Sequence, residues 1–81
     1  MGYHLRDIPK GSFGGFSKIQ EEWEELLDAR EQQSPILELV EFSDLLGAIE
    51  EYVFLKYNIK LDDIIKMKDA TKRAFQTGDR Q

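Results

Sequence analysis

Residues 35–57 read PILELVEFSDLLGAIEEYVFLKY, a mostly apolar segment that contains the acids Glu41 and Asp44. At about 100° per residue, one stripe of a helix spans roughly 80° and holds these residues: Leu37, Glu41, Asp44, Ala48 and Tyr52. Two carboxylates three residues apart repel each other in a dry stripe, and burying such charges costs several kcal/mol each. The segment therefore predicts a helix whose acids meet a cation, basic side chains or a wet cleft.

A first helix is predicted before this segment, over residues 17–32, which read SKIQEEWEELLDAREQ. Ser17 is the expected N-cap. Apolar residues, among them Trp23 and Leu26, recur at helical spacing on one face. We therefore expect that face, including Trp23, to contribute to the core.

The helix boundaries on either side of residues 35–57 have clear signals. Ser34 is expected to cap the second helix, and Pro35 suits its first position. Asn58 tolerates a left-handed cap, so the helix should end near it. A third helix is predicted after Lys60, ending near Gly78. Nothing predicts a strand pair, so the expected fold class is all-α: a small bundle of about three helices.

The first helix offers a second acid pair. Glu22 and Glu25 are three apart and border its apolar face, whereas Glu21 is expected to point away. If the two helices pack antiparallel, this pair can join Glu41 and Asp44 in one pocket. Four carboxylates form a hard oxygen site that suits Mg²⁺ or Mn²⁺ rather than zinc. The alternative is that EEWEE is ordinary solvated helix surface.

Length and composition bound the class of protein. A chain of 81 residues holds one small domain with a marginal core, so self-association is expected. The absence of cysteine excludes disulfides, thiolate catalysis and Cys-based zinc sites. No apolar run is long enough to span a bilayer, and the N-terminal residues lack the apolar core of a signal peptide. We expect a cytoplasmic protein with no membrane partner.

The charge distribution is uneven. Eleven acids and a single base, Arg30, lie between residues 21 and 51, whereas bases outnumber acids on both sides of that range. The net charge of −5 disfavours general nucleic-acid binding, so no nucleic-acid partner is expected. The acidic centre with basic flanks suits a cation site beside an anion site, or merely solvated helix faces.

Residues 1–16 are predicted to be an irregular, flexible lead-in, with the helical domain over residues 17–81. Pro9, Gly11, Gly14 and Gly15 interrupt any regular period there. KGSFGG lacks the GxxxxGK[ST] pattern of a phosphate-binding loop. His4, the one histidine, is expected at the surface.

EEWEE at residues 21–25 and EFSD at residues 41–44, with fifteen residues between them, resemble the EExxE…ExxD signature of the MazG-like all-α nucleotide pyrophosphohydrolases. The likeness covers roughly residues 14–80. It implies Mg²⁺-dependent cleavage, with Mn²⁺ as a substitute, between the α and β phosphates of a (d)NTP. The products would be a nucleoside monophosphate and pyrophosphate. The resemblance also implies a homodimer or homotetramer.

The resemblance implies these metal ligands: Glu22, Glu25, Glu41 and Asp44. It implies catalytic roles for Glu21 and Glu22, with Glu21 orienting a ligand or assisting the attacking water. Substrate phosphates also need cations from the protein. The basic candidates, with the pair four residues apart on the third helix first, are Lys68, Lys72, Lys18, Arg73 and Arg80. The rival hypothesis is a non-catalytic acidic helical module that binds another protein.

Overall fold

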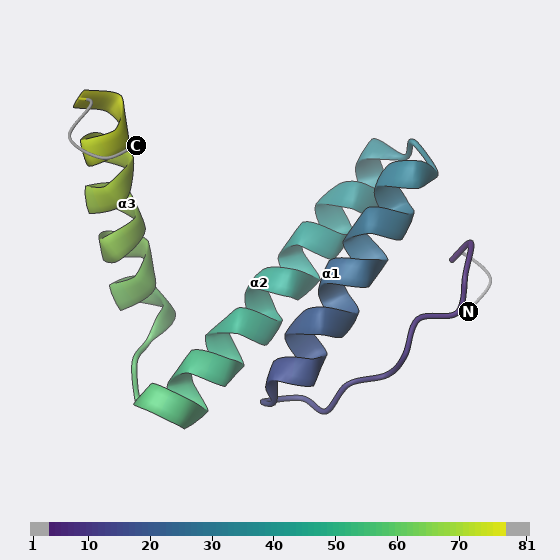
Figure 1. Ribbon diagram of the computed structural model, residues 1–81, viewed down its shortest axis with the longest axis horizontal. Coiled ribbons are helices and arrows are strands. Elements are labelled where there is room, and N and C mark those ends of the chain that lie inside the picture. Colours follow the sequence, from purple (N-terminus) through teal and green to yellow (C-terminus); the bar gives the residue numbers. More distant parts are fainter. Residues whose placement is uncertain (1–3, 78–81) are drawn as a thin grey trace.

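Three α-helices make up the computed structural model, which describes residues 4–77: α1 (Phe16–Glu31), α2 (Pro35–Tyr57) and α3 (Leu61–Thr77) (Figure 1). No strand occurs within residues 4–77, so the predicted all-α class with three helices is confirmed. The helix bounds agree with the sequence pattern to within about a residue. Across the same range, no helix combines the length and hydropathy needed to cross a membrane.

The predicted signals at both ends of α2 are confirmed. The Ser34 hydroxyl accepts a hydrogen bond from the Leu37 backbone N–H at 3.3 Å, and Pro35 is the first helical residue. At the other end, Asn58 adopts the left-handed conformation, with φ 56° and ψ 40°. These local interactions set the length of the helix independently of what it packs against.

The start of α1 differs from the prediction. Gly15, not Ser17, is the N-cap, and the Ser17 hydroxyl instead accepts the Ser12 N–H at 3.0 Å. Gly14 has φ +90°, and a Cβ there would lie 2.6 Å from Leu55 Cδ1 on α2. KGSFGG is therefore a tight turn packed on the second helix. Residues 4–15 form no helix or strand. The flexibility expected of this segment stays a prediction.

Helices α1 and α2 pack side by side as an antiparallel hairpin, whereas α3 diverges from it (Figure 1). Helix α3 makes sparse contact with α2 and none with α1. The radius of gyration is 14.9 Å, against about 12 Å for a compact chain of this length. Helix α3 therefore takes no part in positioning the acidic residues of α1.

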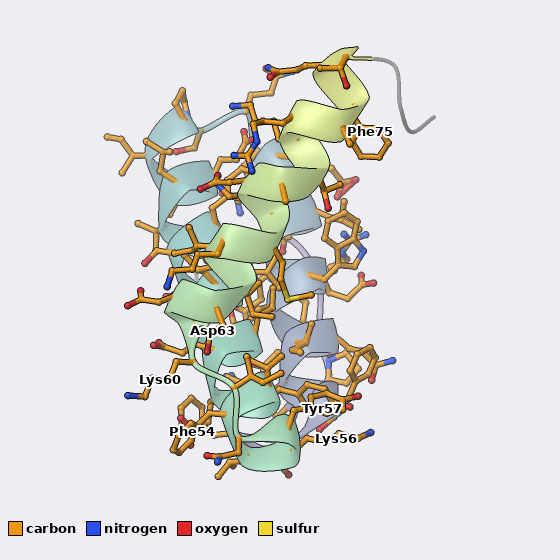
Figure 2. All side chains as sticks on the ribbon, turned by 90° about the vertical axis from the view of Figure 1, so that its left-hand side faces the viewer. Phe54, Lys56, Tyr57, Lys60, Asp63 and Phe75 are labelled. Atoms are coloured by element: carbon orange, nitrogen blue, oxygen red, sulfur yellow. The ribbon has the colours of Figure 1, made fainter. Side chains whose placement is uncertain are left out.

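The junction of α2 and α3 is a short turn whose polar groups are capped locally (Figure 2). Asp63 Oδ2 accepts the Lys60 N–H at 3.3 Å, as a carboxylate at the third helical position commonly does. On the last turn of α2, Lys56 Nζ donates to the Tyr52 hydroxyl at 3.0 Å and lies 5.7 Å from the centre of the Tyr57 ring. The Asp63 bond caps the start of α3, whereas the Lys56 contacts lie within α2, so none of them packs α3 against the hairpin.

The interior of the hairpin is unusually acidic. Among the described residues, only three apolar residues are buried: Leu26, Ala29 and Ala48. The buried acids outnumber them: Glu21, Glu22, Glu25, Asp28 and Glu41. Trp23, which the sequence predicted in the core, is 49% exposed because its side of α1 has no neighbouring helix in this chain. Acids are seldom fully buried unless paired, so the hairpin needs positive partners.

Candidate functional site

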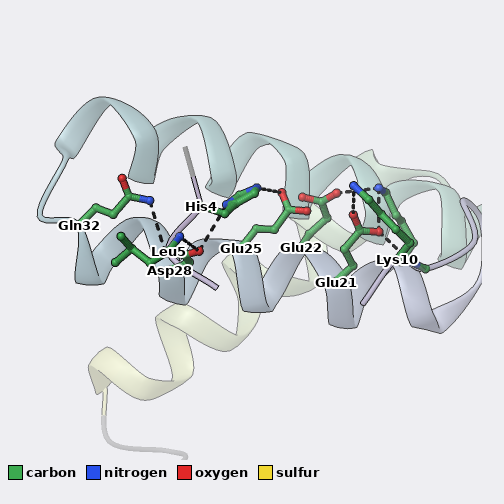
Figure 3. Close-up of polar contacts among 10 residues, drawn as sticks. His4, Leu5, Lys10, Glu21, Glu22, Glu25, Asp28 and Gln32 are labelled. Atoms are coloured by element: carbon green, nitrogen blue, oxygen red, sulfur yellow. Dashed lines mark hydrogen bonds and ion pairs between the residues drawn. The ribbon is translucent and has the colours of Figure 1, made fainter. Parts of the chain in front are cut away.

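Four of the buried acids form a row along α1 (Figure 3). Their positions, 21, 22, 25 and 28, recur at helical spacing on the side that faces α2 and residues 4–12. We call residues 4–12 the N-terminal strap. Glu21, predicted to point away, is 3% exposed because the strap covers its side of α1. Helical periodicity predicts which face of α1 packs on another helix, but it does not predict that the non-helical strap covers Glu21.

The four carboxylates predicted as metal ligands converge. One oxygen from each lies within 4.8 Å of the others, and the four residues come from both helices of the hairpin: Glu22, Glu25, Glu41 and Asp44. Two oxygens on opposite sides of an octahedral Mg²⁺ are about 4.2 Å apart, twice the usual metal–oxygen distance. Small side-chain rotations would therefore bring the four groups to a shared ion. The predicted antiparallel packing is what brings the two pairs together.

Several oxygens at the centre of this cluster have no hydrogen-bond donor. Among the described residues, no donor reaches either oxygen of Glu41 or the Oε1 atom of Glu22. Glu41 is 1% exposed, so bulk water does not replace the missing donors. An unsatisfied buried polar group destabilises a fold by roughly 1–3 kcal/mol, and by more when it is charged. These oxygens have the chemistry and the surroundings of cation ligands.

Crowding of the carboxylates shifts their protonation. Burial first, and then the neighbouring carboxylates, raise the pKa of Glu25 to about 7. Burial, and after it the carboxylate of Asp44, also raise the pKa of Glu41. Glu25 and Glu41 therefore bind protons more tightly than exposed glutamates do. A divalent cation would displace those protons, because metal ligands of this type are deprotonated.

Lys18 supplies positive charge at one end of the row. Its Nζ lies 2.9 Å from Glu22 Oε2 and 3.1 Å from Glu21 Oε1, and the hydrogen bond to Glu22 is the main cause of its raised pKa. Glu21 also accepts the Gly11 N–H at 2.9 Å, and its Oε2 lies 3.7 Å from Lys10 Nζ. Although burial is the largest influence on Glu21 and opposes ionisation, the bonds from Gly11 and Lys18 lower its pKa to about 2. Glu21 is therefore a permanent carboxylate near neutral pH.

Asp44 is exposed in the single chain, although the sequence placed it in an apolar stripe. It lies at the edge of a pocket of about 400 Å³ beside the carboxylate cluster. The lining of this pocket combines acidic, basic and small side chains: Phe13, Lys18, Glu22, Ser43, Asp44, Gly47 and Ala48. Because the pocket opens to solvent, Asp44 is hydrated there rather than buried like Glu41. This pocket gives a ligand access to the acids.

Other basic candidates are not brought to the cluster within one chain. Lys68 and Lys72 are exposed on α3, which does not contact α1, and Lys68 Nζ pairs with Asp69 at 2.9 Å. Arg73 lies on the same helix. Arg80 lies outside the described residues. Their proposed role in binding substrate stays a prediction that would require α3 of another copy.

Sequence reasoning missed two residues at the far end of the row: Asp28 on α1 and His4 on the strap beside it. Asp28 is 0% exposed, and its two oxygens accept the Leu5 N–H at 3.1 and 2.8 Å. His4, expected at the surface, lies instead between Glu25 and Asp28 and has a side chain only 16% exposed. The signal for Asp28 was its place three residues after Glu25 on the same helix face. No local pattern places His4 beside Glu25 and Asp28, because both acids are more than twenty residues away in sequence.

Comparison with models of known protein families, with curated proteins and with solved structures finds no match to this chain.

Proposed function

We propose that this protein is a divalent-cation-dependent nucleoside triphosphate pyrophosphohydrolase. It would hydrolyse the bond between the α and β phosphates of a (d)NTP, releasing a nucleoside monophosphate and pyrophosphate. The observation that carries the proposal is the convergence of four carboxylates from two helices around buried oxygens that lack donors. The EExxE…ExxD pattern supports the choice of reaction, since it is the pattern of the MazG-like hydrolases.

The residues at the cluster suit a hard divalent cation. Mg²⁺ and Mn²⁺ favour carboxylate oxygens, and the four ligands would be Glu22, Glu25, Glu41 and Asp44. The cation supplies Lewis-acid chemistry when bound: it offsets the charge of phosphate oxygens and lowers the pKa of water. Lysine or amide groups bonded to every carboxylate oxygen would have argued against such an ion. Three of the buried carboxylate oxygens have no such donor.

The chain's own residues would perform the remaining tasks. Lys18 lines the pocket beside Glu22 and Asp44, where its ammonium group can face a substrate phosphate. Glu21 would position Lys18 and the Gly11 backbone rather than accept a proton, because an acceptor with a pKa of about 2 is weak near neutral pH. Glu22 keeps one oxygen on Lys18 and directs the other into the cluster.

Homo-oligomerisation is part of the proposal. Large apolar side chains are exposed on α2 and include Ile36 at 76%, Leu39 at 69% and Leu46 at 49%. A monomer seldom leaves so many apolar side chains on one helix in water, because burying each contributes roughly 1.5–3 kcal/mol. A second copy of the hairpin would cover them. It would also provide an α3 whose basic residues could reach the pocket.

Pyrophosphate release is the decisive assay. The protein is incubated with each (d)NTP and millimolar Mg²⁺, and pyrophosphate and nucleoside monophosphate are quantified together. Equal amounts of both products are expected. Release of inorganic phosphate instead would identify a different bond and refute the proposed reaction.

Glu41→Gln is the test variant and Glu50→Gln its matched control. Both remove one charge from α2, but Glu41 is buried in the cluster whereas Glu50 is exposed. Glu41→Gln should abolish turnover while the helices stay folded, and Glu50→Gln should retain it. Equal activity in the two variants would show that the cluster is not the active site. Absence of both turnover and cation binding in the unaltered protein would favour the acidic interaction module.

A further inference from the structure

A second set of potential metal ligands lies beside the four-carboxylate cluster and includes a nitrogen atom. One ligand atom each from His4, Glu25 and Glu41 lie within 4.8 Å of one another. His4 comes from the N-terminal strap, whereas the two acids come from α1 and α2. Three elements that are distant in sequence therefore present donors to one point.

His4 is oriented for this task by Asp28. The His4 Nδ1 atom lies 3.5 Å from Asp28 Oδ2, and Nε2 lies 3.6 Å from Glu25 Oε1 (Figure 3). A carboxylate beside one ring nitrogen favours the tautomer that carries its proton there and leaves the other nitrogen as a metal ligand. Asp28 is itself held by the Leu5 N–H, so the strap and its anchor are fixed together.

Glu41 is a buried carboxylate whose oxygens have no hydrogen-bond donor among the described residues. It is 1% exposed, and among residues 4–77 no donor reaches either of its oxygens. A carboxylate with two such oxygens can bridge two cations, one on each oxygen. Glu25 and His4 also line a separate pocket of about 450 Å³ under the strap, whereas Glu22 and Asp44 line the pocket described above. A second ion would thus have its own route from solvent.

We propose that His4, Glu25 and Glu41 bind a second divalent cation of the transition-metal type, with Asp28 positioning the histidine. A mixed nitrogen and oxygen ligand set favours ions such as Zn²⁺ over Mg²⁺, which prefers oxygen alone. Because the site shares Glu25 and Glu41 with the proposed Mg²⁺ site, it rests on cation binding at that cluster. It gives the N-terminal strap a role as a source of a metal ligand.

The test uses Zn²⁺ alone with the full chain. Since the sequence has one histidine, ring ¹⁵N–¹H spectra of the unaltered protein report on His4 without ambiguity. Zn²⁺ should shift the Nε2 resonance and leave Nδ1 protonated. In calorimetric titrations, His4→Ala should weaken Zn²⁺ binding at least as much as the roughly 10- to 100-fold typical of losing an outer-shell partner. The same variant should leave Mg²⁺ binding unchanged.

Arg6→Ala is the matched control, because Arg6 is also on the strap but pairs with Glu24 and Glu31 outside the cluster. It should bind Zn²⁺ as the unaltered protein does. Unshifted His4 resonances at saturating Zn²⁺ would overturn the second site. If Mg²⁺ still bound in that case, only this inference would fail. If neither ion bound, the cation-dependent function proposed above would fail as well.

Discussion

Replacing Glu41 by glutamine should stabilise the cation-free protein and remove most of the stabilisation that a divalent cation provides. In the cation-free protein, Glu41 is buried beside Glu25 and Asp44 with no donor to either oxygen. Glutamine has nearly the same shape, removes the charge and supplies an N–H₂ group that can donate to these neighbours. Glu41→Gln should therefore stabilise the cation-free protein.

The magnitude follows from the burial of this side chain. Relieving an unsatisfied buried group contributes about 1–3 kcal/mol. For a domain of this length, each kcal/mol changes the Tm by about 4–8 °C. Mg²⁺ at a hundred times its Kd adds about 2.7 kcal/mol to the unaltered protein, and most of this gain should be lost in the variant. The difference in stability between the two proteins should therefore narrow or change sign when Mg²⁺ is added.

Thermal unfolding followed by circular dichroism at pH 8 measures both effects. Protein concentration is held constant because association would also shift the Tm. Glu50→Gln, which removes an exposed charge from the same helix, should change neither stability nor the response to Mg²⁺ by more than about 0.5 kcal/mol. The reasoning is refuted if Glu41→Gln destabilises the cation-free protein, or if Mg²⁺ stabilises both proteins equally.

Three further measurements address protonation, association and the strap. The pKa of Glu25 is raised from 4.5 to about 7, so its contribution to cation-free stability is fully present below about pH 4.5 and is lost as pH rises through about 7. The free energy of unfolding, measured with urea, should therefore fall across that range. A rise would contradict the assignment. Leu39→Glu places a charge on an exposed apolar position of α2 and should shift the light-scattering mass of the protein towards the monomer; an unchanged mass would place the interface elsewhere. Asp28→Asn replaces the charged acceptor of the Leu5 N–H by a neutral one, so hydrogen exchange of that amide should become about tenfold faster. Asp7→Asn, at an exposed residue of the strap, should leave the exchange rate unchanged.

Local sequence signals were sufficient for the helices. The cap at Ser34 with Pro35, and the left-handed Asn58, are interactions within a few residues of the chain, so their geometry can be inferred without knowing the rest of the fold. The prediction for the start of α1 was wrong because Ser17 fits the local preference for an N-cap, whereas the structure uses Gly15. The contact of Gly14 with Leu55, which comes from another helix, decides that the turn precedes Phe16.

The candidate site was predictable only in part, for the same reason. Periodicity alone put Glu22 and Glu25 on one face and Glu41 in an apolar surrounding, and simple antiparallel packing joins them. Periodicity could not reveal that Glu21 is buried, because the strap that covers it has no repeating pattern.

Residue spacing predicts the three helices and, once the first two are antiparallel, the convergence of four carboxylates between them. These depend on spacing and on the energetic penalty of isolated buried charge. Tertiary contacts decide that α3 stands away from the hairpin and that His4 lies against Glu25 and Asp28 of the row. Both outcomes depend on where a non-helical segment or a turn directs the chain, and such directions arise from contacts between residues far apart in sequence.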